Sequence, residues 1–117
     1  MTVNEVFDKA IALLGYNNSD GGYEGLEVLK SRVLYCVNQI LADLTLKGEL
    51  TELNDLLPIS GVGIEAVIYG TAMLLSLSIC DNEKNVVFAG IYNIKRATYK
   101  SSIQTKKDTL PSGDGGV

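Results

Sequence analysis

The sequence predicts an all-α protein, a small four-helix bundle with a long second helix and a flexible C-terminal tail. Along four segments of the 117 residues, apolar side chains recur at steps of three and four, and no segment alternates apolar and polar residues as a half-buried strand would. A charge-free run over residues 66–80 lies between Glu65 and Asp81. Because this run is shorter than the roughly 20 apolar residues of a membrane span, we expect a helix enclosed by other helices or by other copies of the chain.

The first helix is predicted over about residues 3–14. Thr2 and Glu5 have the spacing of a capping box, in which the hydroxyl and the carboxylate each satisfy a free backbone amide. One apolar face follows at helical spacing, formed by Val3, Val6, Phe7, Ala10, Ile11 and Leu14. Gly15 is expected to end the helix, and residues 16–22 have the composition of a loop.

The second helix is predicted over about residues 23–47 and would be the longest element of the chain. Its apolar stripe consists of Leu26, Leu29, Val33, Val37, Ile40 and Leu44. At 1.5 Å for each residue it would extend roughly 37 Å, so the shorter helices could all pack against it. Gly48 is the expected C-terminal stop.

Residues 50–63 are predicted to form a surface connection, because Pro58 forces the residue before it toward extended geometry. The third helix is predicted over about residues 63–80, and Asp81 or Asn82 should end it and cap the fourth helix, over about residues 83–103. Beyond Gln104 the chain is rich in Lys, Asp, Ser, Gly and Pro, which cannot bury a core alone. We therefore expect a helical domain over residues 1–105 and a flexible tail over residues 106–117.

Charge is distributed unevenly along the chain, whose net charge is −4. Residues 1–83 carry four basic and twelve acidic side chains, whereas residues 84–107 carry six basic and no acidic ones. This asymmetry favours head-to-tail packing between copies, or docking of the basic segment on an acidic partner. The alternative is a solvated helix face whose lysines only aid solubility. The acidic body argues against general nucleic-acid binding, which needs a broad basic surface.

No pattern for catalysis, cofactor binding or metal binding is found, so we expect no enzyme, no cofactor and no metal site. The chain has no histidine, which is the commonest general base and metal ligand. Cys36 and Cys80 lie far apart without further ligands, and both are expected to be reduced and buried. Gly61-Val62-Gly63 precedes a helix but lacks the lysine of a phosphate-binding loop. No export signal is visible, so a cytoplasmic location is expected.

A candidate partner interface lies on the fourth helix and the tail. Its predicted charges and apolar anchors are Tyr92, Lys95, Arg96, Tyr99, Lys100, Lys106 and Lys107. Tyrosine and arginine together are favoured at protein interfaces. In this interpretation Val87, Ile91, Ile94 and Thr98 form the apolar row of the helix, with the two tyrosines and Phe88 beside it. The alternative is ordinary amphipathic packing with basic tips that reach solvent.

Four segments in order carry a resemblance to a known family. They are Leu50-Thr51-Glu52-Leu53-Asn54-Asp55-Leu56-Leu57-Pro58, Ala66-Val67-Ile68-Tyr69-Gly70-Thr71-Ala72-Met73-Leu74-Leu75, the acidic turn Asp81-Asn82-Glu83, and Tyr92-Asn93-Ile94-Lys95-Arg96. Together with the opening helix they resemble the head–tail connector (adaptor) proteins of tailed bacteriophages, over about 100 residues. The chain departs from the commoner pattern at Ser78-Ile79-Cys80, where small or acidic residues are usual.

The resemblance implies a bundle that assembles into a ring, twelve- or thirteen-fold in such proteins. It implies a place at the head–tail junction of the virion, between the portal protein of the filled head and a tail-side completion protein, reached from the host cytoplasm during assembly. DNA would pass through the lumen without sequence-specific binding, and no membrane is involved. Opposite charges on two parts of the chain suit a repeating contact that closes into a ring, and an acidic surface lets DNA slide past.

Two other functions remain open. The first is a small helical regulatory or adaptor protein of a prophage or host that acts as a dimer. The second is an accessory subunit such as a small terminase-like DNA-packaging protein, which would need DNA binding with steep salt dependence.

Overall fold

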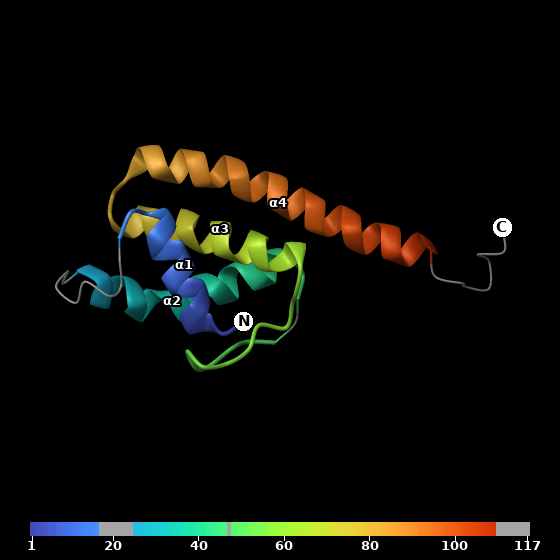
Figure 1. The fold of residues 1–117 in the computed structure, drawn as a ribbon, viewed down its shortest axis with the longest axis horizontal. Coiled ribbons are helices and arrows are strands. Elements are labelled where there is room, and N and C mark those ends of the chain that lie inside the picture. The colour runs from blue at the N-terminus through green and yellow to red at the C-terminus, as the bar shows by residue number, and fades with distance from the viewer. Residues whose placement is uncertain (17–24, 47, 110–117) are drawn as a thin grey trace.

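The computed structural model describes residues 1–16, 25–46 and 48–109, and its fold confirms the predicted all-α class. The four helices are α1 (Val3–Leu13), α2 (Gly25–Asp43), α3 (Val62–Ser78) and α4 (Asn82–Thr109). Figure 1 shows three layers, in which α3 lies between α4 on one side and α1 with α2 on the other. Within the described residues the β-type pairing is limited to an isolated bridge between Thr2 and Leu56.

The capping box of α1 is present as predicted. The amide of Glu5 donates to Thr2 Oγ1 at 3.2 Å, and the amide of Thr2 donates to Glu5 Oε1 at 2.9 Å. Hydrogen bonding to Thr2 lowers the pKa of Glu5. The chain then leaves the helix through Gly15, whose φ of 94° lies in the left-handed region that glycine adopts without strain.

α2 is shorter than predicted, and α4, with 28 residues, is the longest helix. The described part of α2 ends at Asp43, because the amide of Leu46 reaches back to the carbonyl of Leu41 at 3.0 Å and Thr45 takes a left-handed φ of 63°. This is the hydrogen-bond pattern of a Schellman stop, which occurs before Gly48. Residues 23, 24 and 47 of the predicted helix lie outside the described residues.

The connection from α2 to α3 is held against the bundle by specific hydrogen bonds. Asn38 on α2 bonds both backbone groups of Leu50, at 2.9 Å each. Asp55 accepts from the amides of Thr51 and Glu52, and its carbonyl accepts from the amide of Val3. The connection therefore follows the start of α1 without helical structure, as expected.

The close packing of α3 depends on two glycines. A Cβ atom at Gly70 would lie 2.7 Å from the Cδ1 atom of Ile40 on α2 and 2.9 Å from the Cε1 atom of Tyr92 on α4. A Cβ atom at Gly63 would lie 2.3 Å from the Cδ1 atom of Ile59. Separations this short are not found in folded proteins, so both glycines are explained by contacts inside the subunit.

The subunit's own helices enclose most of the charge-free helix. Ala72 and Leu75 are fully buried, whereas Ile79 is only partly buried. Leu77 points outward and is exposed. Covering α3 therefore does not require other copies of the chain.

The turn between α3 and α4 confirms one prediction from the sequence and contradicts another. Asp81 caps α4, since its Oδ1 atom accepts from the amide of Lys84 at 3.0 Å. Cys80 was expected to be buried but is exposed, because it occupies the left-handed position (φ 56°) of the stop that ends α3. Cys36 is partly buried, and burial raises the pKa of its thiol.

α4 continues beyond its predicted end. Its backbone is helical to Thr109, so the first residues of the expected tail, 106–109, belong to the helix. Residues 110–117 lie outside the described residues. None of the helices in the described part of the chain is both long enough and apolar enough to span a membrane.

The burial of α3 yields a test with a matched control. We expect Leu75→Asp to lower the free energy of unfolding by roughly 4 kcal/mol or more, because it places an unpaired charge in the core. Leu77→Asp, two residues further along the same helix, should change it by less than about 1 kcal/mol because Leu77 is exposed. Urea denaturation measures both. Equal effects of the two substitutions would contradict the layered packing.

Candidate functional site: the two faces of the fourth helix

The predicted interface residues of α4 do not share one exposed surface. Tyr92 and Tyr99 are buried, with 4% and 9% of their surfaces exposed, and belong to the core of the bundle. This burial contradicts their expected role as apolar anchors for a partner. The row that packs inward contains Phe88, Tyr92 and Tyr99. Of the predicted row, Val87, Ile94 and Thr98 are exposed, and Ile91 is partly buried against the core.

Arg96 and Tyr92 are joined to α2 through a single carboxylate. The Tyr92 hydroxyl donates to Asp43 Oδ2 at 2.5 Å, and Arg96 Nε lies 2.8 Å from the same oxygen. The Arg96 N–H is not aimed along that line, so the contact is an ion pair without a formal hydrogen bond. Burial, and then the hydrogen bond to Asp43, raise the pKa of Tyr92 well above its usual range.

The other basic side chains near the start and middle of α4 also turn toward the subunit. Lys95 donates to Glu65 on α3 at 3.1 Å and lies over the ring of Tyr69. Lys84 donates to the carbonyl of Leu14 at the end of α1 at 2.6 Å and pairs with Asp81 at 3.6 Å. A cation at the C-terminus of a helix is favoured by the helix dipole. These lysines therefore hold helices together.

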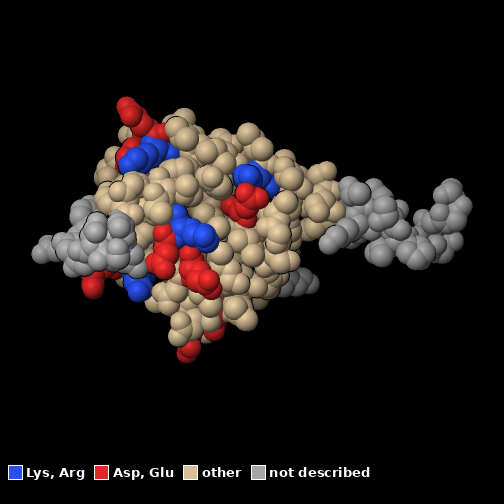
Figure 2. Space-filling view, in the orientation of Figure 1, with Lys and Arg blue, Asp and Glu red and all other residues tan. Residues whose placement is uncertain are grey.

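Lys100 is partly exposed and makes no ion pair or hydrogen bond with the described residues. The side chains of Lys106 and Lys107 lie outside the described part of the structure. In Figure 2 basic and acidic side chains lie next to each other on the face in view, with wide uncharged areas between them. Three of the six basic side chains of residues 84–107 are thus paired with carboxylates of the same subunit.

Beyond Glu83, an uncharged row follows the outward side of α4, and we call it the α4 stripe: Val86, Val87, Gly90, Ile94, Ala97 and Ser101. Val86, Val87 and Ile94 expose 69%, 56% and 67% of their surfaces. The sequence does not distinguish this face from the tyrosine face, because rows of tyrosines and of aliphatic residues recur at the same spacing on α4. The sequence feature that could have identified this face is the row of uncharged residues at steps of three and four from Val86 to Ser101.

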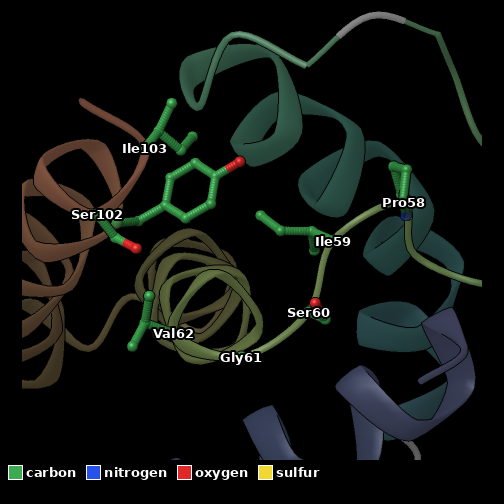
Figure 3. A pocket seen from close by; sticks show the side chains of 8 residues that line it. Pro58, Ile59, Ser60, Gly61, Val62, Ser102 and Ile103 are labelled. Atoms are coloured by element: carbon green, nitrogen blue, oxygen red, sulfur yellow. The ribbon is translucent and has the colours of Figure 1, made fainter. Parts of the chain in front are cut away.

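A pocket of about 430 Å³ lies between the connection into α3 and the C-terminal half of α4 (Figure 3). It is lined by residues 58–62 and by Tyr99, Ser102 and Ile103. None of these residues has a charged or imidazole side chain, so the lining supplies no general base for its hydroxyls. Among the described residues no three His, Cys, Asp or Glu side chains gather in a way that could hold a metal ion.

Comparison of the chain with family models, curated proteins and solved structures finds no match. The α4 stripe is an uncovered apolar face on a subunit with a closed core.

The inward placement of Arg96 yields a test against Lys100. We expect Arg96→Glu to lower the free energy of unfolding by about 1 kcal/mol, because it replaces an ion pair with two like charges at Asp43. Lys100→Glu should change it by less than about 0.5 kcal/mol. Urea denaturation measures the free energy of unfolding of both variants. If Arg96→Glu has the same free energy of unfolding as the parent, the ion pair between Arg96 and Asp43 is not stabilising.

The raised pKa of Tyr92 predicts a loss of stability at alkaline pH. The contribution is fully present below the pKa of an unfolded tyrosine, about 10, and falls as the pH rises above it. We expect the free energy of unfolding to drop as the pH rises from about 10 toward the raised pKa of Tyr92, and Tyr92→Phe to show a smaller drop. Tyr35→Phe, at an exposed tyrosine, is the control and should behave as the parent. An equal drop in Tyr92→Phe would contradict the assignment.

Proposed function

We propose that this chain is a subunit of a ring-forming head–tail connector of a tailed bacteriophage or prophage. It joins the portal protein of the filled head to a tail-side completion protein, and DNA passes through the lumen of the ring. The observation that carries the proposal is the α4 stripe. A stripe of exposed Val and Ile side chains on a long helix, in a subunit whose core is already closed, is the kind of surface that marks a protein–protein contact.

The segments that resemble the connector family have defined positions in this fold, which supports the proposal. Gly70 and Ala72, from the Tyr-Gly-x-Ala pattern, lie at the contacts of α3 with its neighbours. The acidic turn supplies the cap of α4 through Asp81. Leu57, just before Pro58, is buried and fixes the connection to the start of α1, where its amide donates to the carbonyl of Met1. These residues thus stabilise the bundle of the subunit, and we propose that such subunits assemble into a ring.

The charges of the subunit suit a channel for DNA. The chain carries a net charge of −4, and Lys84, Lys95 and Arg96 are neutralised by carboxylates of the same subunit. Tight DNA binding needs several basic side chains free to contact phosphates. In a ring of such subunits, few basic side chains would bind the phosphates of the DNA as it passes through the lumen.

The proposal is tested by the size and activity of the purified chain. We expect native mass spectrometry and electron microscopy to show a closed ring, alone or when bound to the portal protein of the same phage. Filled heads that lack this protein should accept tails only after it is added. A stable dimer with no ring and no head–tail joining would favour a regulatory protein. DNA binding that weakens steeply with salt would favour a packaging subunit.

A further inference from the structure

Gly90 is a glycine that contacts inside the subunit do not explain. It lies in the interior of α4, where glycine is less favourable than alanine because of its backbone freedom. A Cβ atom added there would meet no heavy atom within 4 Å, unlike a Cβ atom at Gly63 or Gly70. Gly90 is exposed on the outer layer of the subunit (Figure 1), so it leaves an opening in the α4 stripe.

The large side chain that could fill such an opening stands one turn further along the same face. Ile94 exposes 67% of its surface. If two copies of α4 pack antiparallel about a two-fold axis level with residue 92, Gly90 of each copy lies opposite Ile94 of the other. In a two-fold contact the same pairing occurs twice, and a large side chain opposite a small one is the arrangement that packs well.

The same face of α4 has opposite charges at its two ends. Glu83 is exposed and Lys100 is partly exposed, and neither makes an ion pair with the described residues. The exposed positions between them are all uncharged: Val86, Val87, Gly90, Asn93, Ile94, Ala97 and Thr98. One unpaired acid and one unpaired base therefore border the uncharged part of this face.

The register that places Gly90 opposite Ile94 also brings these two charges together. Glu83 lies nine residues before the level of residue 92, and Lys100 lies eight residues after it. The two levels differ by one residue, or about 1.5 Å along the helix axis, so Glu83 of each copy comes beside Lys100 of the other. In a parallel pair the like charges would meet, and Gly90 would face Gly90. Size and charge thus both favour the antiparallel pair.

We infer that two free copies of this chain pair through their α4 stripes as a two-fold antiparallel dimer, with Ile94 over Gly90 and Glu83 beside Lys100. The dimer goes beyond the proposed function, because it is the form of the chain outside the ring. It covers the apolar face of the free subunit. One helix from each copy makes a small contact, so a larger interface with a ring neighbour or another partner can replace it.

The first test reverses the charge at each end of the face. Glu83→Lys brings two lysines together at both ends of the antiparallel dimer, and Lys100→Glu brings two glutamates together. In a mixture of the two variants opposite charges meet again, since the new lysine faces the new glutamate and native Lys100 faces native Glu83. Glu52→Lys is the control, because it changes the net charge equally at an exposed position outside α4.

We expect sedimentation velocity over a concentration series to show that Glu83→Lys and Lys100→Glu each raise the Kd of the dimer roughly tenfold or more, because both symmetric ion pairs become repulsive. The mixed dimer of the two variants should have a Kd close to that of the parent, and Glu52→Lys should behave as the parent. Labelling one variant with a heavy nitrogen isotope lets native mass spectrometry identify the mixed dimer.

The second test concerns the apolar part of the contact. We expect Ile94→Asp to raise the Kd of the dimer by roughly a hundredfold or more, because it places a charge against the other helix. Leu56→Asp is the matched control, since Leu56 exposes 68% of its surface and lies in the connection before α3. Circular dichroism and urea denaturation should show that both variants keep the fold of the parent.

The inference is wrong if the parent chain is never found as a dimer, whether it stays monomeric or appears only as a closed ring. It is equally wrong if the mixture of charge variants associates as weakly as each variant alone, because that result excludes the antiparallel register. Normal dimers of Ile94→Asp would place the contact away from the α4 stripe. The ring is tested separately by head–tail joining, so each of these results can occur with the proposed function intact.

Discussion

The close contact of α2, α3 and α4 at Gly70 is the constraint on which the rest of the structure depends. With no Cβ atom at Gly70, Ile40 approaches α3 from one side and Tyr92 from the other. Seating Tyr92 there brings its hydroxyl to Asp43 and turns Lys95 toward Glu65. Because residues of a helix are fixed in rotation relative to one another, the same placement turns Val86, Gly90 and Ile94 outward.

This rotation of α4 also accounts for the charge of the surface. In the sequence the basic side chains of α4 form a separate block, yet in space Lys84, Lys95 and Arg96 each lie beside a carboxylate of the same subunit. Such partly exposed pairs contribute little to stability. Their consequence is that the row from Val86 to Ile94 on the exposed side of α4 has no charged side chain within it. A neutral apolar face can be buried against another protein without the cost of removing charges from water.

The exposed face of α4 was not predicted from the sequence, and the reason is physical. Composition favoured the tyrosines and basic residues of α4 as a contact surface. Tyr92 and Tyr99 recur at the same helical spacing as Val87 and Ile94, so periodicity alone cannot decide which row faces the core. That choice depends on the shape of α3, where Gly63 and Gly70 leave room for aromatic rings.

The sequence by itself determined the features that act over a few residues: four helices, the capping box of Thr2 and Glu5, the stop at Gly15 and the cap at Asp81. Only the tertiary structure decided that α2 stops at Thr45, that Cys80 is exposed and that α4 presents its aliphatic row to solvent. Caps and periodicity arise from hydrogen bonds and side chains one turn apart. Which face is buried is decided by the volume and polarity of helices that are distant in sequence, and these meet only in the folded bundle.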